Sequence, residues 1–310
     1  MSGRPAGDRV RTVFLGSGAF AVPSLQALSE HPAVDLVGVV TAPPRPAGRK
    51  LRLEPSPVQR AGIEPVLTPA RLREAESVAA VLALGPGLLV LADYGQIVPA
   101  ALLDLTFGAL NLHPSLLPRH RGASPIPATI MAGDDETGVT LMRMDRGLDT
   151  GPIVAVERVP LLGTETAPDL EVRLSAVAAA LLDRSLEPWI DGELTARSQS
   201  DDGATLTRPL RREDGRLDAL LPAANLERRV RAYLPWPGTF LEADGERLVV
   251  VAASVGPSSP GDVPGRLVRQ GDRPALTTAD GRLVLDAVTP PGRRPMSGAD
   301  WLRGRRAPLP

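Results

Sequence analysis

The chain has 310 residues, 43% of them hydrophobic and 23% charged, as in a globular protein large enough for two domains. It contains no cysteine, which excludes disulfide bonds, a thiol nucleophile and cysteine-based zinc sites, and no apolar run approaches the length of a membrane span. The net charge of -1 argues against indiscriminate binding of nucleic acid.

The charge is unevenly distributed along the chain. Residues 1–204 hold 18 basic and 24 acidic side chains, whereas residues 205–310 hold 17 basic and 12 acidic ones. Such an asymmetry suggests that the C-terminal part meets a polyanion. A mildly basic surface without a partner would give the same count, so both interpretations stay open.

The first two thirds of the chain alternate between apolar runs typical of strands and segments with helical spacing. Met1 to Asp8 is polar, has no secretory core segment and is typical of a disordered tail. Strands are predicted at Val10–Leu15, Asp35–Thr41, Leu88–Leu91, Ala109–Leu112 and Thr137–Met144. Strands that alternate with helices predict an α/β fold with a mostly parallel sheet, whose ligands bind at the carboxyl ends of the strands.

The helices of this region are predicted from their capping residues. One follows Gly18 and continues through Leu25 and Leu28. A second is predicted to begin at Thr68 as N-cap, with Pro69 in its first turn. A third, long and amphipathic, is predicted from the capping signal Thr166–Asp169 to about Trp189. By contrast, Ala42–Pro57 is rich in proline, glycine and arginine and is predicted to lack regular structure.

The pattern changes after about residue 195. Gln199–Pro222 is polar and is predicted to be a linker. Short apolar runs separated by Gly, Pro and Asp follow, a pattern typical of a small β-barrel or sandwich: Arg247–Ala252, Gly265–Val268, Ala275–Thr278 and Arg282–Ala287. We therefore predict a first domain over 8–198, a linker over 199–222 and a β-barrel domain over 223–310.

An asparagine and a histidine stand two residues apart at the end of an apolar run, Asn111 and His113. If that run is a strand, period two puts both side chains on one face, at an edge where ligands bind. An amide donor beside an imidazole suits a reaction in which a carbonyl becomes an oxyanion. A strand end whose polar side chains only bond a turn would show the same spacing, so both interpretations stay open.

The other two histidines carry weaker signals. His31 precedes a proline and is predicted to lie on the surface. His120 stands between Arg119 and Arg121 and is predicted either on the surface or in contact with a substrate. Neither histidine has the spacing of a metal site, and no bound metal is expected.

Two further motifs match known sites only in part. Gly16–Ala21 fits the dinucleotide-binding fingerprint, but no acidic residue follows at the end of the second strand, Val39–Thr41. The glycines therefore predict a tight turn bordering a pocket. Asp149-Thr150-Gly151 is half of an aspartic protease site, and no second copy exists. The chain also lacks the Gly-x-Ser-x-Gly elbow of a serine nucleophile. With neither a metal nor a covalent nucleophile expected, direct transfer of a group to an incoming nucleophile is the remaining type of reaction.

The segment Pro43–Arg52 carries four cations in eight residues, namely Arg45, Arg49, Lys50 and Arg52. It has no apolar pattern that could bury it. A solvated loop explains this composition, and so does an arm that binds phosphates. Its position after the second strand, near the ligand edge, favours the arm.

Taken together, these segments resemble the folate-dependent formyltransferases, and within them the branch that formylates methionyl-tRNA. The Asn-x-His-x-Ser-Leu-Leu-Pro block is typical of the whole family, and the arginine-rich loop and the Pro-Trp-Pro segment are typical of the tRNA branch. The resemblance rests on Phe14–Phe20, Arg45–Val58, Ala92–Gly95, Asn111–Pro125, Ala132–Asp134, Gly138–Thr140, Asp149–Gly151 and Arg231–Pro237. Leu206 and Ala219 depart from it, because tyrosine and tryptophan are usual there.

The resemblance implies a cytoplasmic enzyme, acting as a monomer and without a metal. It would transfer the formyl group of 10-formyltetrahydrofolate to the α-amino group of methionine on initiator tRNA. Its fold would pair a Rossmann-like sheet, with helices on both faces, with a small OB-like β-barrel that binds tRNA. By the family's pattern, Asn111 and His113 stabilise the oxyanion and Asp149 orients His113. The pattern assigns folate binding to Ser115, Leu116, Leu117 and Pro118, and tRNA binding to Arg45, Arg49, Lys50 and Arg52.

Two rival functions remain. A formyltransferase acting on a nucleotide sugar or a glycinamide nucleotide would use the same Asn111, His113 and Asp149, but it would need neither the arginine-rich loop nor a basic second domain. An RNA-binding module on an α/β scaffold would leave the Asn-x-His pair unexplained. Turnover on different acceptors distinguishes the three.

Overall fold

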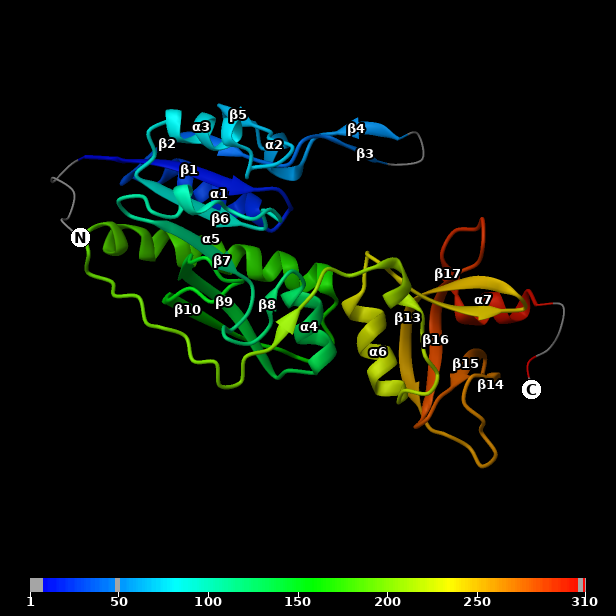
Figure 1. The fold of residues 1–310 in the computed structure, drawn as a ribbon. Helices are drawn as coiled ribbons and strands as arrows, with labels where there is room; N and C mark the ends of the chain where they lie inside the picture. The colour runs from blue at the N-terminus through cyan, green and yellow to red at the C-terminus, as the bar shows by residue number, and fades with distance from the viewer. Residues whose placement is uncertain (1–7, 48–50, 306–308, 310) are drawn as a thin grey trace. The chain divides into compact units, whose positions relative to one another are not determined.

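The computed structural model describes residues 8–47, 51–305 and 309. These residues form two compact units (Figure 1). The first consists of the chain up to Pro125 together with 136–160 and 171–207, and the second consists of 126–135, 161–170 and the chain from Arg208 onward. Each unit is described by itself.

The first unit is built on a seven-stranded sheet in the order β10-β9-β7-β6-β1-β2-β5. Neighbours from β7 to β5 are parallel, and β9 and β10 add an antiparallel edge. The strands are β1 Val10–Gly16, β2 Val34–Val40, β5 Val66–Leu67, β6 Leu88–Ala92, β7 Ala109–His113, β9 Glu136–Arg143 and β10 Ile153–Pro160. The five strands predicted in this region are confirmed within one or two residues, whereas β5 and β10 were not predicted.

Both faces of this sheet are covered by helices. Val13 and Leu15 of β1 belong to a buried cluster with Val81 of α3 (Ala75–Ala83). Phe14, between them, points to the opposite face: a β-carbon on Gly16 would lie 2.6 Å from its ring and 2.8 Å from Ala21, the first residue of α1 (Ala21–Glu30). The period of two along β1 therefore places helices on both sides of the sheet, as predicted.

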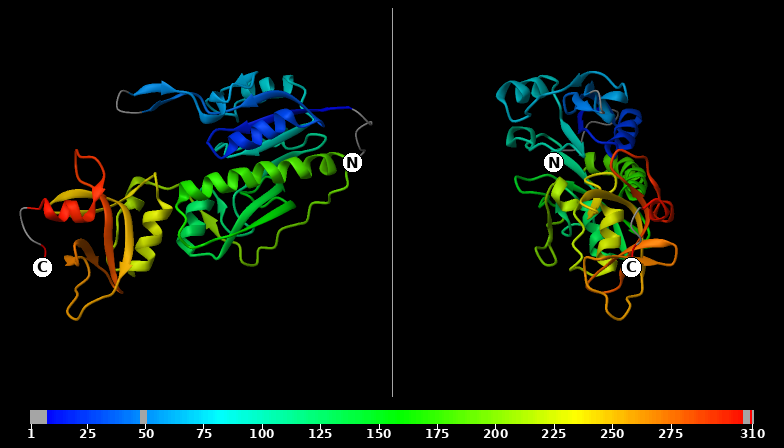
Figure 2. Two further views of the ribbon diagram at one scale, coloured as in Figure 1. Left: turned by 180° about the vertical axis from the view of Figure 1, so that it is seen from behind. Right: turned by 90° about the vertical axis from the view of Figure 1, so that its right-hand side faces the viewer.

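The long helix α5 (Ala167–Ile190) runs beside the sheet (Figures 1 and 2). The predicted cap is confirmed, since the Thr166 hydroxyl donates to the Asp169 carboxylate at 2.6 Å and accepts from the Asp169 N–H at 3.4 Å. Near its other end, Trp189 donates its indole N–H to the carbonyl of Phe107 at 3.0 Å. The long helix predicted from Thr166–Asp169 to about Trp189 is therefore confirmed.

The predicted helix start at Thr68 is wrong, because α3 begins only at Ala75. The side chain of Gln96 explains the difference. Its oxygen accepts from the N–H of Leu72 at 2.8 Å, and its amide donates to the carbonyl of Pro69 at 3.4 Å. These bonds engage backbone groups that a first helical turn would need, and they hold Leu72 fully buried.

The sequence predicted that the arginine-rich segment lacks regular structure, and this prediction is wrong for part of it. Strands β3 (Arg45–Ala47) and β4 (Arg52–Glu54) pair as an antiparallel hairpin. An arm with this hairpin extends from the first unit in Figure 1. Proline at Pro46 is tolerated because a two-stranded hairpin leaves one edge of each strand unpaired. The short helix α2 (Pro57–Arg60) follows, capped by the Ser56 hydroxyl.

The second unit carries an antiparallel sheet, curled as a half-barrel, in the order β12-β13-β16-β15-β14, with β17 beside β16. Its strands are β12 Thr239–Ala243, β13 Glu246–Gly256, β14 Leu267–Gln270, β15 Arg273–Thr277, β16 Arg282–Thr289 and β17 Met296–Ser297. Two register shifts in β13, next to Ala252, supply the bend. The four predicted strands of this region are confirmed as β13 to β16.

Helix α6 (Ala223–Ala232) packs on this sheet. Its buried residues include Leu226 and Val230, four apart on one face, and they join a core with Leu248, Leu283 and Leu285. The remaining elements are the helices α4 (Pro125–Ala132) and α7 (Gly298–Arg303), the 3-10 turns η1 (Ala100–Leu102) and η2 (Arg212–Gly215), and the short strands β8 (Arg121–Gly122) and β11 (Leu206–Thr207). The strands β8 and β11 pair in parallel and matter for the site below.

Candidate functional site

His113 is the last residue of β7 and is 4% exposed. Its Nε2 lies 3.0 Å from the carbonyl oxygen of His120, and its Nδ1 lies 3.7 Å from Oδ2 of Asp149. A carbonyl oxygen can only accept, so Nε2 carries the proton and Nδ1 is the free ring nitrogen in the neutral imidazole. The side chains of His113 and Asp149, predicted to act together, therefore approach each other at Nδ1.

Asp149 is held in a left-handed backbone conformation, with φ of 52°. Its Oδ2 accepts a hydrogen bond from the backbone N–H of Gly122 at 2.8 Å, which fixes the carboxylate against β8. Its carbonyl oxygen accepts from the side-chain amide of Gln199 at 2.9 Å. Aspartate tolerates this backbone conformation better than most residues, and such geometry persists only where surrounding contacts determine it.

Burial lowers the pKa of His113 below its ordinary value of 6.5, and the charge of His120 acts in the same direction. The carboxylate of Asp149 and the carbonyl of His120 oppose that shift without reversing it. At neutral pH the imidazole is therefore neutral. A proton received at Nδ1 would turn its approach to Asp149 into an ion pair.

Asn111 lies two residues before His113 on β7, opposite Leu91 of β6 and Met142 of β9. Period two places both side chains on the same face, and Asn111 is the only partly exposed residue of the strand. An amide that reaches solvent beside a buried imidazole can donate to an oxygen that approaches from outside. The structure therefore brings together Asn111, His113 and Asp149 at the carboxyl end of a central strand.

His120 does not lie at the surface, one of the two positions that the sequence allowed, because it is 7% exposed. Its backbone is left-handed, with φ of 58°. Its N–H donates to the hydroxyl of Thr205 at 2.8 Å, and its carbonyl faces His113. Thr205 immediately precedes β11, which pairs with β8, so the segment after residue 195 forms part of the wall of the site.

His31, predicted on the surface, is also buried, with 6% exposed. Its Nδ1 accepts from the N–H of Ala33, and its Nε2 faces the carbonyl of Asp183 on α5. Both ring nitrogens are therefore engaged, and the contact of Nε2 joins the end of α1 to α5. The proline that follows His31 gave no indication of this packing.

Gln199 is a second contributor from this segment, and the sequence did not predict it. Besides Asp149, its amide donates to the carbonyl of Gly151 at 2.7 Å, and its oxygen accepts from two nitrogens of Arg121. The only sequence signal was a glutamine in a polar stretch, which is typical of a solvated linker. Its contacts depend on tertiary structure that no local pattern encodes.

The turn after His113 is built largely from internal bonds. The hydroxyl of Ser115 donates to the carbonyl of Arg119 at 2.7 Å, and Ser115 is fully buried. The N–H of Leu117 donates to the hydroxyl of Thr140 at 3.2 Å. Leu116 and Pro118 are the partly exposed members of the predicted folate-binding set. Folate binding by these four residues stays a prediction.

Arg45 and Arg52, two of the four cations of the arm, are exposed on β3 and β4. Arg49 and Lys50, the other two, lie outside the described residues. Leu51 and Leu53 on the same hairpin are 71% and 69% exposed. Binding of tRNA by these four cations stays a prediction.

The glycine turn after β1 is occupied by a carboxylate of this chain. A β-carbon on Gly18 would lie 1.6 Å from Oδ2 of Asp93, which also accepts from the backbone N–H of Gly18. Burial raises the pKa of Asp93 to about 6, and the charge of Glu171 contributes. A negative group in this position opposes the pyrophosphate of a dinucleotide, in line with the expectation of a tight turn without NAD.

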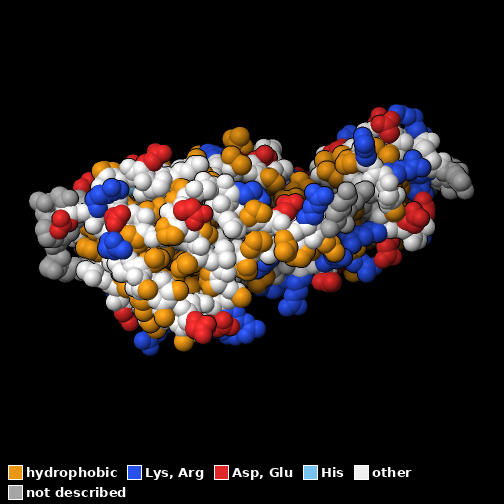
Figure 3. All heavy atoms as spheres, turned by 90° about the horizontal axis from the view of Figure 1, so that it is seen from above, with side chains coloured by type: hydrophobic (Ala, Val, Ile, Leu, Met, Phe, Trp, Pro, Cys, Tyr) orange, Lys and Arg blue, Asp and Glu red, His pale blue; other side chains and the backbone are white. Residues whose placement is uncertain are grey.

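Other features of the described chain show no competing site. Over residues 8–47 and 51–305, no group of three or more His, Asp or Glu side chains is placed to hold a metal. Within the same ranges no helix is long and apolar enough to cross a bilayer. On the face seen in Figure 3, basic and acidic side chains are interspersed among apolar ones.

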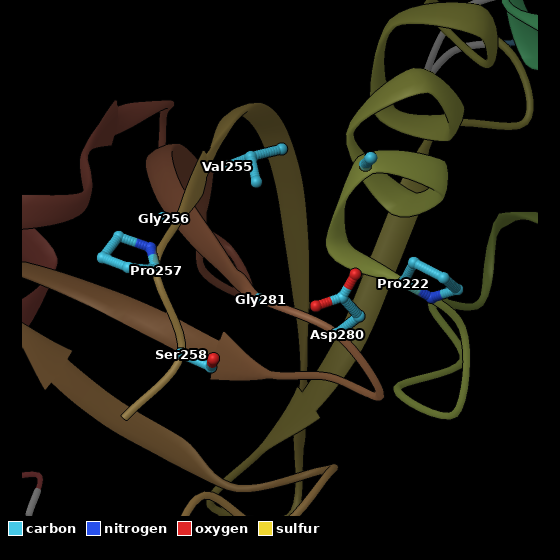
Figure 4. Close-up of a pocket in the computed structure, with 8 residues that line it drawn as sticks. Pro222, Val255, Gly256, Pro257, Ser258, Asp280 and Gly281 are labelled. Atoms are coloured by element: carbon cyan, nitrogen blue, oxygen red, sulfur yellow. The ribbon is translucent and has the colours of Figure 1, made fainter. Parts of the chain in front are cut away.

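The second unit contains an open hollow of about 450 Å³. Figure 4 shows Pro222 and Asp280 on one side and the segment 255–258 on the other. Asp280 is its only ionisable side chain, and none of the predicted site residues lines it.

Two family models match the chain. The model described as formyl transferase matches residues 10–186, and the model described as formyl transferase, C-terminal domain, matches residues 209–306. Together they cover most of both units. The first match includes Asn111, His113 and Asp149, and it ends before Gln199 and Thr205.

Curated relatives are similar over nearly the full length. A methionyl-tRNA formyltransferase of Chloroflexus aggregans is 43% identical over 305 residues, covering 96% of this chain and 98% of that protein. One of Halorhodospira halophila is 44% identical over 301 residues, covering 96% of each.

Solved structures share the fold at low identity. An N-formyltransferase from Helicobacter canadensis, in complex with folinic acid and dTDP-3-aminofucose, gives a TM-score of 0.63 at 16% identity, covering 89% of this chain and 98% of that one. HypX from Aquifex aeolicus, in complex with tetrahydrofolic acid, gives 0.61 at 17% identity, covering 95% and 47%. At these identities the likeness concerns the fold alone.

Proposed function

The chain belongs to the formyl transferase family, and we propose that it transfers the formyl group of 10-formyltetrahydrofolate to the α-amino group of methionine on initiator tRNA. The observation that carries the proposal is the buried His113, with a free Nδ1 facing Asp149, beside the partly exposed Asn111. Such an acceptor would place the protein in the cytoplasm, where initiator tRNA is used.

The reaction joins the amine nitrogen to the formyl carbon and breaks the bond from that carbon to N10 of the folate. An α-amine has a pKa of about 8, so a useful neutral fraction exists near pH 7 without a strong base. As the amine attacks, the formyl oxygen gains negative charge. The amide of Asn111 is placed to donate to that oxygen, and a donor aimed at developing charge is the largest single term in many such reactions.

The amine must then lose a proton. Nδ1 of His113 is the free acceptor, because Nε2 is committed to the carbonyl of His120. The imidazolium formed in this way lies 3.7 Å from the Asp149 carboxylate, which stabilises it. The proton can pass on to N10 as the carbon–nitrogen bond breaks. Asp149 thus supports His113 in both directions of transfer.

The residues around the site fit a formyl donor with a flat aromatic ring. Leu148, next to Asp149, is 60% exposed, and Leu116 and Pro118 are partly exposed on the turn after β7. Apolar surface of this kind suits a pterin. Because the Ser115 hydroxyl and the Leu117 N–H are already bonded, the predicted folate wall would act through Leu116, Pro118 and backbone carbonyls.

The acceptor would be held by charge. Arg45 and Arg52 are exposed on the arm, and the C-terminal residues from 205 carry a net charge of +5. Several arginines of the second unit already pair with acidic side chains, which reduces the number left for phosphates: Arg208 with Asp214, Arg231 with Glu227 and Arg282 with Asp262. The arm is therefore the sharper candidate for phosphate contacts.

The test is a formyl-transfer assay with 10-formyltetrahydrofolate and three acceptors: methionine-charged initiator tRNA, methionine-charged elongator tRNA and an amino sugar nucleotide. Turnover confined to initiator tRNA is expected. Turnover only on the sugar nucleotide would keep Asn111, His113 and Asp149 in their roles and overturn the acceptor. Salt-sensitive RNA binding without any turnover would contradict the enzyme.

A further inference from the structure

The side chain of Gln199 bridges two parts of the active site. Its amide nitrogen donates to the carbonyl of Asp149 at 2.9 Å and to that of Gly151 at 2.7 Å. Its oxygen accepts from Nε and Nη2 of Arg121, at 3.1 and 2.9 Å. Both donors and the acceptor of this amide are therefore used, and each is used on a residue near His113.

Gln199 bonds the Asp149–Gly151 turn, whose backbone is strained. Asp149 has a φ of 52°, a conformation that costs free energy for any residue with a β-carbon. The N–H of Gly122 fixes its carboxylate, and the amide of Gln199 fixes its carbonyl. If that carbonyl rotates, the backbone of Asp149 relaxes and the carboxylate moves relative to His113.

Arg121 in turn prevents the side-chain amide of Gln199 from flipping, which would exchange its oxygen and nitrogen. Its side chain is 7% exposed and carries a charge, which must be compensated in a buried position. It meets the Gln199 oxygen, the carboxylate of Asp201 at 3.1 Å and the carbonyl of Ser200 at 3.4 Å. With the guanidinium on the oxygen side, the amide N–H₂ can only point at the two carbonyls.

We propose that Gln199 is a positioning residue of the active site, whose amide holds the Asp149–Gly151 turn so that the Asp149 carboxylate stays aimed at Nδ1 of His113. Its expected effect on catalysis rests on the proposed function, whereas its expected effect on His113 does not. Gln199 lies beyond the part of the chain matched by the N-terminal family model, which ends at residue 186. The segment that leads to the second unit thus contributes to the active site.

The decisive variant is Gln199→Glu. It keeps the length of the side chain and an oxygen for Arg121, but it replaces the N–H₂ donor with an oxygen that repels the carbonyls of Asp149 and Gly151. Gln199→Met is the second variant, with a similar volume and no hydrogen bonds. Asp202→Asn is the matched control: its side chain is exposed on the same segment, and its backbone N–H, which the substitution keeps, bonds the hydroxyl of Ser200.

The first readout is catalysis, with thermal unfolding measured to verify the fold. Both Gln199 variants are expected to lower kcat by about 10- to 100-fold, the scale of a misplacement of roughly 1 Å, with KM for either substrate little changed. Asp202→Asn is expected to retain kcat. A Gln199→Glu enzyme with the kcat of the wild type would overturn the proposal. A purely structural role of Gln199 would also contradict it: the variants would then have a smaller fraction of folded protein but an unchanged kcat per folded molecule.

The second readout is the titration of His113 by NMR, which needs no substrate and is simplified by the presence of only three histidines. The charged groups that face His113 are Asp149, which raises its pKa, and His120, which lowers it. Displacing Asp149 is expected to lower the pKa of His113 further in Gln199→Met, which adds no charge, as is expected of Asp149→Asn. An unchanged titration of His113 would contradict the role of Gln199, whether or not the wild type is active. Inactivity of the wild type on every acceptor would refute only the proposed function.

Discussion

The carbonyl oxygen of His120 lies 3.0 Å from Nε2 of His113, and this one contact assigns the two ring nitrogens. Since the carbonyl can only accept, the proton of the neutral imidazole sits on Nε2 and the lone pair on Nδ1. Nδ1 is the nitrogen that faces Asp149. A peptide group seven residues along the chain thus determines which nitrogen is available for proton transfer.

The first prediction concerns the titration of His113. Burial lowers its pKa and the Asp149 carboxylate opposes that shift, so Asp149→Asn should lower the pKa further. In the wild type the NMR resonance of His113 should titrate below pH 6.5, and in the variant at a still lower pH. A rise in the pKa on removal of the carboxylate would contradict the assignment of the pair.

The second prediction concerns the two site residues on β7. Asn111→Ala and His113→Ala should each lower the rate of formyl transfer by about 100- to 1000-fold, because the first loses the donor to the developing oxyanion and the second loses the proton acceptor Nδ1. The affinity for tRNA, measured by filter binding, should stay within about twofold, since neither residue belongs to the basic arm. Equal losses of affinity and rate would show that these side chains bind the acceptor.

The third prediction concerns the arm. Arg45→Ala and Arg52→Ala should raise KM for tRNA and leave KM for the folate unchanged. If each arginine contacts one phosphate, the slope of log affinity against log salt should fall by about 1 per substitution. Arg158→Ala provides the control, an arginine on β10 that is already paired with Glu136. An equal effect of all three substitutions would indicate a general loss of positive charge.

The fourth prediction concerns Asp93 and the pH dependence of stability. Its pKa of about 6 in the folded protein lies above the ordinary value of 3.8, so the ionised form is disfavoured by folding. The contribution of Asp93 to the free energy of unfolding therefore falls as pH rises between these values, and stays low above them. Asp93→Asn should raise Tm at about pH 7.5 and leave it nearly unchanged at about pH 4.

The size of that change should be modest, because Asp93 is exposed and solvent screens its charge. Asp183→Asn, at an exposed position of α5, is the control. A difference in Tm between wild type and Asp93→Asn that is the same at both pH values would show that the effect does not arise from ionisation.

The sequence predicted those features that depend on local periodicity. The strands β1, β6 and β7 are short apolar runs whose period leaves little choice, and α5 has a cap that can be recognised from Thr166 and Asp169 alone. The pair Asn111 and His113 was found for the same reason, because two residues on one strand must share a face.

The features that were missed depend on contacts distant in sequence. The predicted helix at Thr68 gives way to the side chain of Gln96, and His31 is buried by α5, more than 150 residues later. The hairpin of the arm forms despite Pro46, because its strands pair only with each other. Gln199 resembles any polar residue of a linker until the fold brings it beside Asp149.

The position of β11 has a consequence for exchanging parts between related enzymes. Through Gln199 and Thr205, the chain contributes to the candidate site before it enters the second unit for the last time, at Arg208. A chimera joined at residue 186 or 198 would therefore bring in a foreign glutamine or threonine position along with the foreign C-terminal part. Swaps that preserve catalysis should place the junction after Thr207, so that the catalytic fragment keeps its own bracing segment.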